Sequence, residues 1–256
     1  MALLPTSVRE RRSYISQVIV RLMKLFLILA SLLLACGQRA DDPIMISTQP
    51  PSSPAQTYSF LSLGDSYTIG ESASEYERWS VQLADMLRRD SVSIANPDII
   101  ARTGWTTAEL QAAIKASGNQ KTYDLVSLLI GVNNQYRGQS TDRYRTEFRE
   151  LLQTSIRFAG GRPNRVFVLS IPDWGQSPFA KNRDARQIAT EIDAFNAIAQ
   201  DECRKATVAF VNITPITRKA AGDATQFASD GLHYSGRQMQ QWAEAALPVA
   251  GKLLAQ

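Results

Sequence analysis

Histidine and cysteine are scarce in this sequence of 256 residues. It contains one histidine, His233, and two cysteines, Cys36 and Cys203, with no Cys-x-x-Cys pair. Zinc and related metals are usually bound by closely spaced cysteines and histidines. We therefore expect no metal and no other cofactor. A structural disulfide is not expected either, because Cys36 lies beside an amino-terminal segment that predicts processing.

The sequence also lacks a basic domain. Its formal net charge is +4, a sign that would suit a nucleic-acid-binding protein. Residues 1–35 carry a basic excess of the same size, so the rest of the chain is close to neutral. The excess of basic residues therefore belongs to the amino-terminal segment, and nucleic acid is not an expected partner.

No apolar run is as long as the roughly 20 residues that cross a bilayer. The run from Leu25 to Ala35 follows Lys24, which is typical of a secretory signal peptide. It ends at Cys36-Gly37, which resembles the processing site of bacterial lipoproteins, where the cysteine is lipidated and becomes the first residue. An ordinary signal peptide with an incidental cysteine is the alternative.

Three segments are predicted: a leader over 1–35, a tether over 36–57 and one α/β domain over 58–256. Residues 38–57 contain several prolines and many small polar residues, which is typical of flexible linkers. Residues 1–22 are either an extended leader or precede the true start at Met23. A lipidated Cys36 predicts an exported protein anchored to a membrane. Where the source has two membranes, Gly37 after the cysteine favours the outer one.

Residues 58–256 predict alternating strands and helices. The expected strands are 58–63, 94–101, 123–130, 165–171 and 208–213, and the expected helices are 78–89, 106–116, 142–158, 185–204 and 236–254. Repeated strand–helix units form a parallel sheet with helices packed against it. The sequence therefore predicts a three-layer α/β/α sandwich with about five parallel strands.

A serine and the single histidine lie near opposite ends of this domain. Ser66 follows the first predicted strand in the run Gly64-Asp65-Ser66, where parallel α/β proteins place ligands and reacting groups. Alone, this run is equally typical of a turn. Near the carboxyl end, Asp230 precedes His233. Serine, histidine and aspartate are the components of an acyl-transfer triad.

Four motifs, in order along the chain, resemble those of the GDSL or SGNH family of serine esterases and lipases. They are Gly64-Asp65-Ser66-Tyr67, the glycine of Thr103-Gly104-Trp105, Gly131-Val132-Asn133-Asn134 and Asp230-Gly231-Leu232-His233. Tyr67 and Asn134 stand where the family usually has leucine and aspartate. The resemblance spans residues 58–250 and implies a flavodoxin-like strand order.

The resemblance implies a role for each matched residue. Ser66 would be the nucleophile, His233 the general base, and Asp230 the carboxylate that orients the imidazole. The backbone amides of Ser66 and Gly104 and the side chain of Asn133 would donate hydrogen bonds to the oxyanion.

Four further positions have their own interpretations. Asp65 is the rival acidic residue, but its place beside Ser66 favours a local backbone role. Trp174 would either contact an acyl or sugar group or lie in the interior. Residues 136–138 either touch substrate or only join a strand to a helix. Cys203 is expected to be a helix residue without chemistry.

The expected function is hydrolysis of a carboxylic ester through a Ser66 acyl-enzyme. No segment predicts a long apolar lid, so acetyl and other short-acyl esters are expected before long-chain lipids. The alternatives are transfer of the acyl group to a sugar alcohol, lysophospholipase or thioesterase activity, and non-catalytic binding. The complete set of Ser66, Asp230 and His233 argues against the last.

Overall fold

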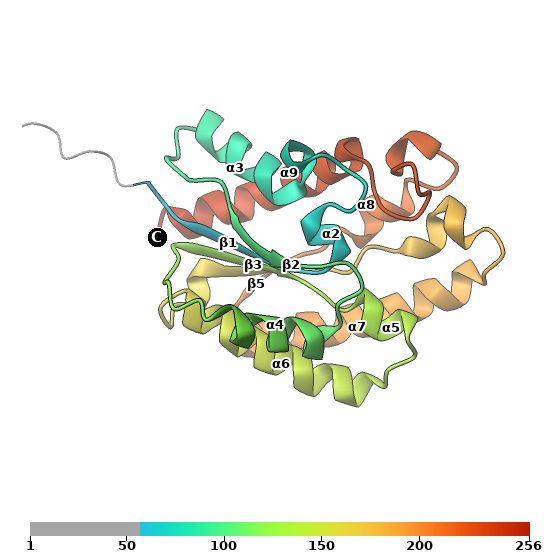
Figure 1. Ribbon diagram of the computed structural model, residues 1–256, viewed down its shortest axis with the longest axis horizontal. Helices are drawn as coiled ribbons and strands as arrows, with labels where there is room; N and C mark the ends of the chain where they lie inside the picture. The colour runs from blue at the N-terminus through green and yellow to red at the C-terminus, as the bar shows by residue number, and fades with distance from the viewer. Residues whose placement is uncertain (1–56) are drawn as a thin grey trace, which may run out of the picture. The chain divides into compact units, whose positions relative to one another are not determined.

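The computed structural model describes residues 57–256. Cys36, the predicted leader and all but the last residue of the predicted tether lie outside the described residues. The centre of the domain is a parallel sheet in the order β2-β1-β3-β4-β5 (Figure 1). Its strands are β1 (Phe60–Gly64), β2 (Asp98–Ala101), β3 (Leu125–Leu129), β4 (Val166–Leu169) and β5 (Ala209–Val211). The predicted fold class and the flavodoxin-like order are confirmed.

Long helices cover both faces of the sheet. α3 (Trp79–Arg89) and α9 (Gly236–Leu254) pack together on one face, and α4 (Thr107–Ser117), α6 (Thr141–Phe158) and α7 (Ala185–Lys205) lie on the other (Figure 1). α3, α4, α6 and α7 each return the chain from one parallel strand to the next, as in right-handed crossovers. Among residues 57–256, no helix is both long enough and apolar enough to cross a bilayer.

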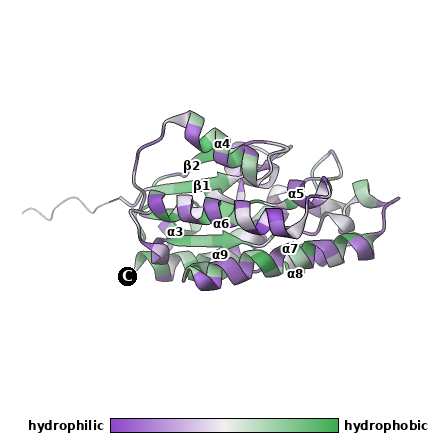
Figure 2. Cartoon of the chain, turned by 90° about the horizontal axis from the view of Figure 1, so that it is seen from below, coloured by the Kyte–Doolittle hydropathy of each residue, from purple (hydrophilic) through white to green (hydrophobic). Residues whose placement is uncertain are grey.

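The sheet is buried on both faces. Every residue of β1, β3 and β4 is buried, which explains why these strands are nearly continuous apolar runs. The two polar side chains among them satisfy each other, since Ser62 Oγ and Ser127 Oγ lie 3.0 Å apart. The helices carry hydrophobic and hydrophilic residues on different sides, and the strands between them are largely hydrophobic (Figure 2).

The strand boundaries differ from the prediction most at β2. It begins at Asp98, whereas the prediction began at Ile94, which makes only an isolated bridge to Tyr58. Pro97 lies between them and has no backbone N–H to continue the ladder. A capping box starts α4, as the spacing of Thr106 and Glu109 favours: the Thr106 amide donates to Glu109 Oε2 at 2.8 Å, and the Glu109 amide donates to Thr106 Oγ1 at 3.4 Å.

Short helices after the strands were not predicted. α2 (Ser66–Ile69) follows β1, α5 (Val132–Tyr136) follows β3, and α8 (Thr214–Arg218) follows β5. Each is about one turn long, too short for a periodic apolar pattern to show in the sequence. The first two matter for function, because they begin at or beside Ser66 and Asn133.

Candidate active site

Ser66 lies at the sharp exit from β1. Asp65 is the residue before α2, and Ser66 is the first residue of that helix, buried at the carboxyl edge of the sheet. Gly64 makes the turn possible, because a Cβ there would collide with the Thr68 side chain and the Leu129 carbonyl. The strand therefore delivers Ser66 to the edge where the sequence predicted it.

The Asp65 carboxylate caps α2. Its Oδ1 accepts a hydrogen bond from the Tyr67 amide at 3.0 Å, which satisfies one of the free N–H groups at the helix start. Burial raises the pKa of Asp65 to about 7, against the lowering effect of the backbone hydrogen bonds from Tyr67 and from its own amide. Asp65 has the local backbone contact expected for it.

His233 and Asp230 form a hydrogen-bonded pair. His233 Nδ1 lies 2.7 Å from Asp230 Oδ2. Asp230 Oδ1 also accepts from the amides of Leu232 and His233, at 2.8 and 2.9 Å. Burial alone would raise the pKa of Asp230, but hydrogen bonds from the His233 ring, the Leu232 amide and Ser72 outweigh it and hold the pKa below its ordinary value. The carboxylate therefore stays ionised beside the imidazole.

Ser72 is a member of this group that sequence reasoning missed. Its Oγ donates to Asp230 Oδ2 at 2.7 Å, and its backbone is left-handed, with φ of 62°. No local signal marks this contact, because Ser72 lies in the loop after α2 and Asp230 is far away in the chain. The loop after α2 therefore helps to hold Asp230.

Aromatic residues hold the segment that carries His233. Phe227 and Tyr234 form an antiparallel bridge, and the fully buried Tyr234 donates its hydroxyl to the Asp173 carbonyl at 2.9 Å. The His233 ring meets the Tyr67 ring edge-on, with centroids 5.8 Å apart. Since Tyr67 is the neighbour of Ser66, this contact places the imidazole against the helix α2 that begins at Ser66.

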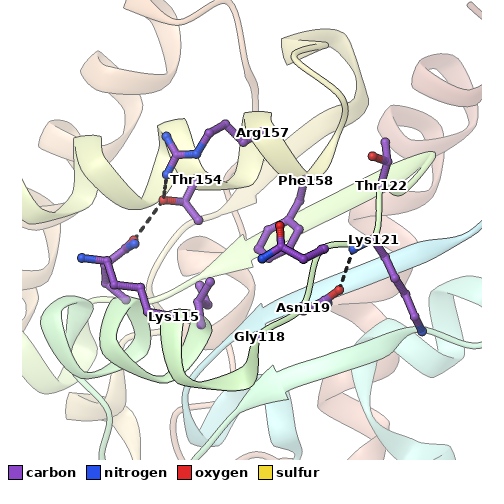
Figure 3. A pocket seen from close by; sticks show the side chains of 11 residues that line it. Lys115, Gly118, Asn119, Lys121, Thr122, Thr154, Arg157 and Phe158 are labelled. Carbon is purple, nitrogen blue, oxygen red and sulfur yellow. Dashed lines mark hydrogen bonds between the residues drawn. The ribbon is translucent and has the colours of Figure 1, made fainter.

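One cavity brings the predicted residues together. A pocket of about 190 Å³ is lined by Ser66, Gly104, Asn133 and His233. The remainder of its lining is mostly apolar and includes Val132, Tyr136, Trp174, Phe179 and Leu232. A cavity of about 310 Å³ between α4 and α6, lined by residues such as Lys115 and Phe158, contains none of the motif residues (Figure 3).

Three hydrogen-bond donors surround the smaller cavity. Among the described residues, the amides of Ser66 and Gly104 have no acceptor. For Ser66 this is usual, because its amide is the first N–H of α2. Asn133 Nδ2 donates to the Trp105 carbonyl at 3.0 Å, which leaves its second N–H for another acceptor. Gly104 has a φ of +85°, a conformation that favours glycine.

The family can be assigned from the sequence match. Residues 62–241 match the model of the GDSL-like Lipase/Acylhydrolase family. The chain belongs to this family. It is therefore a serine esterase, an enzyme that hydrolyses carboxylic esters.

Several solved structures share the fold of this chain. TesA aligns with a TM-score of 0.61 at 18% identity, over 76% of this chain and 99% of that chain. The esterase EstA from Pseudoalteromonas sp. gives 0.59 at 16%, over 78% and 100%. A variant of an acetyl xylan esterase from Geobacillus stearothermophilus gives 0.59 at 16%, over 76% and 94%. Among curated proteins, none matches the chain significantly.

Arg137 supports the loop that carries Gly104 in the esterase. Its Nη2 donates to the Gly104 carbonyl at 2.5 Å, and its Nη1 lies 3.1 and 3.2 Å from the two carboxylate oxygens of Glu109. On the other side of the loop, the Thr103 hydroxyl contacts the Glu71 carboxylate. Residues 136–138 therefore do more than join a strand to a helix.

Replacing Arg137 with glutamine is expected to lower kcat about tenfold while changing KM little. The arginine fixes the peptide next to the Gly104 amide, and loss of one such hydrogen bond to a charged group corresponds to about a tenfold effect. Steady-state kinetics on 4-nitrophenyl acetate measure it, with Arg143→Gln on the exposed face of α6 as the matched control. An unchanged kcat with a lower melting temperature would show that Arg137 only stabilises the loop.

The contacts of Asn134 explain why an asparagine stands where the family usually has an aspartate. It is fully buried, accepts from the Thr107 amide at 3.1 Å, and donates to Thr107 Oγ1 at 2.6 Å and to Gln139. An aspartate has no N–H for the last two contacts. Asn134 therefore joins α5 to the start of α4, and Asn133 is the asparagine that reaches the cavity.

Trp174 is buried and also lines the Ser66 cavity. It is 4% exposed, and its indole N–H donates to Gln135 Oε1 at 2.9 Å. It also lines the Ser66 cavity and meets the Tyr136 ring edge-on at 5.4 Å.

Cys203 lies in α7 away from this cavity, where burial raises the pKa of its thiol to about 12. Within residues 57–256, no group of three or more His, Cys, Asp or Glu residues is placed to hold a metal ion.

Proposed function

We propose that the esterase works through an acyl-enzyme on Ser66, with His233 as the general base and Asp230 as the residue that orients it. The observation that carries this proposal is the cavity in which Ser66, His233 and the three donors meet. The hydrogen bond between Asp230 and His233 Nδ1 supports it, because that bond leaves Nε2 as the basic nitrogen.

The reaction follows in two halves. His233 Nε2 accepts the proton of Ser66 Oγ as the oxygen attacks the ester carbonyl carbon. The amides of Ser66 and Gly104 and the side chain of Asn133 stabilise the negative oxygen that forms. The alcohol leaves with the proton from His233, and water then attacks the acyl-enzyme with the same base, releasing the acid and free Ser66.

The substrate proposed is an ester of acetate or another short acid. The cavity of about 190 Å³ is small and mostly apolar, which suits a short acyl group. Similar solved structures include acetyl xylan esterases, which supports acetyl esters. Lysophospholipase or thioesterase activity is the alternative. Transfer of the acyl group to a sugar alcohol would use the same nucleophile.

A series of 4-nitrophenyl esters from acetate to decanoate tests the proposal. We expect kcat/KM to be highest for acetate or butyrate and to fall as the chain outgrows the cavity. A maximum at decanoate would contradict the short-acyl proposal. In the same assay, a sugar alcohol that diverts the acyl group from free acid into a new ester would identify a transferase.

The proposal for the rest of the chain concerns its location. We place a leader at 1–35 and a tether at 36–57 before the catalytic domain at 58–256, with lipid on Cys36. More than one acyl chain gives stable membrane attachment, and lipoproteins of this class carry several. Mass spectrometry of the mature amino terminus is expected to find a lipidated Cys36 and to find none in Cys36→Ser. An unmodified amino terminus beyond Cys36 would contradict membrane anchoring. The outer membrane is proposed only for a source with two membranes.

A further inference from the structure

A second cavity adjoins the one that contains Ser66. It has a volume of about 430 Å³ and shares Tyr136 and Trp174 with the Ser66 cavity. The other residues of its lining are mostly polar and include Gln135, Arg183, Asp184, Gln187 and Glu191. We refer to it as the polar cavity. A substrate that extends past the aromatic pair would enter it.

Glu191 accepts two side-chain hydrogen bonds at the edge of this cavity. Its Oε2 accepts from Gln135 Nε2 at 2.6 Å, and its Oε1 accepts from Gln187 Nε2 at 2.8 Å. No Lys or Arg of residues 57–256 forms a salt bridge with it. Each carboxylate oxygen keeps further acceptor capacity. The carboxylate is therefore held in place with its charge unpaired.

The aromatic wall of the Ser66 cavity that is formed by Tyr136 and Phe179 is exposed. The large exposed hydrophobic residues of the described chain are Tyr76, Tyr136 and Phe179, and the last two lie around the Ser66 cavity. Tyr136 is 51% exposed and Phe179 is 45% exposed. Exposed aromatic groups beside a reacting serine are typical of a binding surface. The wall gives a ligand a flat apolar face to lie against.

Both a long acyl chain and a sugar ring fit an aromatic face, and the polar lining of the polar cavity distinguishes between them. A long acyl chain over Tyr136 would take water from Glu191, Arg183 and Asp184 and return no hydrogen bond, which is unfavourable. A sugar ring has an apolar C–H face for the aromatic wall and hydroxyl groups that donate to a carboxylate. The combination therefore fits a saccharide.

We propose that the polar cavity binds the sugar part of an acetylated saccharide while its acetyl group lies in the Ser66 cavity. Glu191 accepts hydrogen bonds from sugar hydroxyls, and Tyr136 contacts the ring. This inference rests on the proposed function of Ser66. It adds a specificity site made by α5 and by the start of α7, which the motif residues do not include.

The test compares two acetyl esters. We expect Glu191→Gln to lower the ratio of kcat/KM for monoacetylated cellobiose to kcat/KM for 4-nitrophenyl acetate about tenfold, the effect of one hydrogen bond to a charged group. Glu150→Gln on the exposed side of α6 is the matched control and is expected to keep the ratio. Tyr136→Leu is expected to lower the ratio, whereas Tyr136→Phe, which keeps the ring, is expected to preserve most of it.

The outcomes separate this inference from the serine mechanism. If the unmodified enzyme turns over 4-nitrophenyl acetate but not the acetylated disaccharide, the sugar site is wrong and the esterase remains. The same holds if Glu191→Gln lowers both rates equally. If kcat/KM is higher for 4-nitrophenyl octanoate than for the acetylated disaccharide, the polar cavity is part of an acyl site and the sugar site is wrong. No turnover of any ester would contradict the proposed function itself.

Discussion

Alanine at position 66 is expected to reduce ester hydrolysis by about 10⁴- to 10⁶-fold. The hydroxyl is the only part of Ser66 that forms the covalent intermediate, and its removal leaves the Ser66 amide and the other two oxyanion donors in place. The small residual rate would come from those donors acting on a bound water. The measurement is kcat on 4-nitrophenyl acetate, together with the mass of the protein after reaction with a phosphonate ester, which should increase only when Ser66 is present.

His233→Ala is the companion variant. We expect it to cost nearly as much as Ser66→Ala, and the double variant to be no slower than either, because the two side chains act in one step. The control is the melting temperature, which should stay close to that of the unmodified enzyme, since neither side chain fills the core. A Ser66→Ala enzyme that retains its rate, with its fold intact, would exclude the seryl acyl-enzyme.

The second large effect concerns the two neighbouring asparagines. Asn133→Ala is expected to lower kcat by about 10²–10³, the cost of one lost oxyanion donor. Its stability should change little, because Asn133 is partly exposed and its side chain has one described partner, the Trp105 carbonyl in the loop before α4. Asn134→Ala should do the reverse and lower the unfolding free energy by about 2 kcal/mol, because it leaves the buried Thr107 amide without its acceptor.

Both variants require kinetics and denaturant unfolding on the same protein preparations. The two residues are matched in type and adjacent in the chain, so each serves as the other's control. Equal losses of kcat with unequal losses of stability would mean that the helix α5 as a whole, and not the Asn133 side chain, supports the transition state. A kcat of Asn133→Ala within threefold of normal would remove it from the oxyanion site.

The sequence predicted those parts of the fold that depend on near neighbours. The buried strands β3 and β4 are continuous apolar runs, and α4 begins at a capping box, so each is visible within a few residues. β2 was predicted too long, because Pro97 interrupts the ladder in a segment that otherwise looks extended. The short α2 and α5 were missed, since one turn of helix has no period to detect.

In the candidate site too, features that depend on near neighbours were predicted, and contacts between distant segments were not. Ser66 follows a predicted strand, so a parallel sheet was enough to expect it at this edge, whereas Gly104 and Asn133 were expected in the site from the family resemblance. The contact of Ser72 with Asp230 and that of Arg137 with the Gly104 carbonyl were not predicted, because the partners are distant in the chain. Such contacts depend on how loops approach one another, and no single stretch of sequence encodes that.

The position of His233 has a consequence for when the enzyme becomes active during its synthesis. Ser66 and the oxyanion donors are made early, but the base lies just before α9, the last helix of the domain, which packs against α3 (Figure 1). A nascent chain that ends before this segment has a nucleophile without a base. Under the proposed mechanism, ester hydrolysis therefore begins only after the segment that carries His233 has been made and has folded onto the rest of the domain.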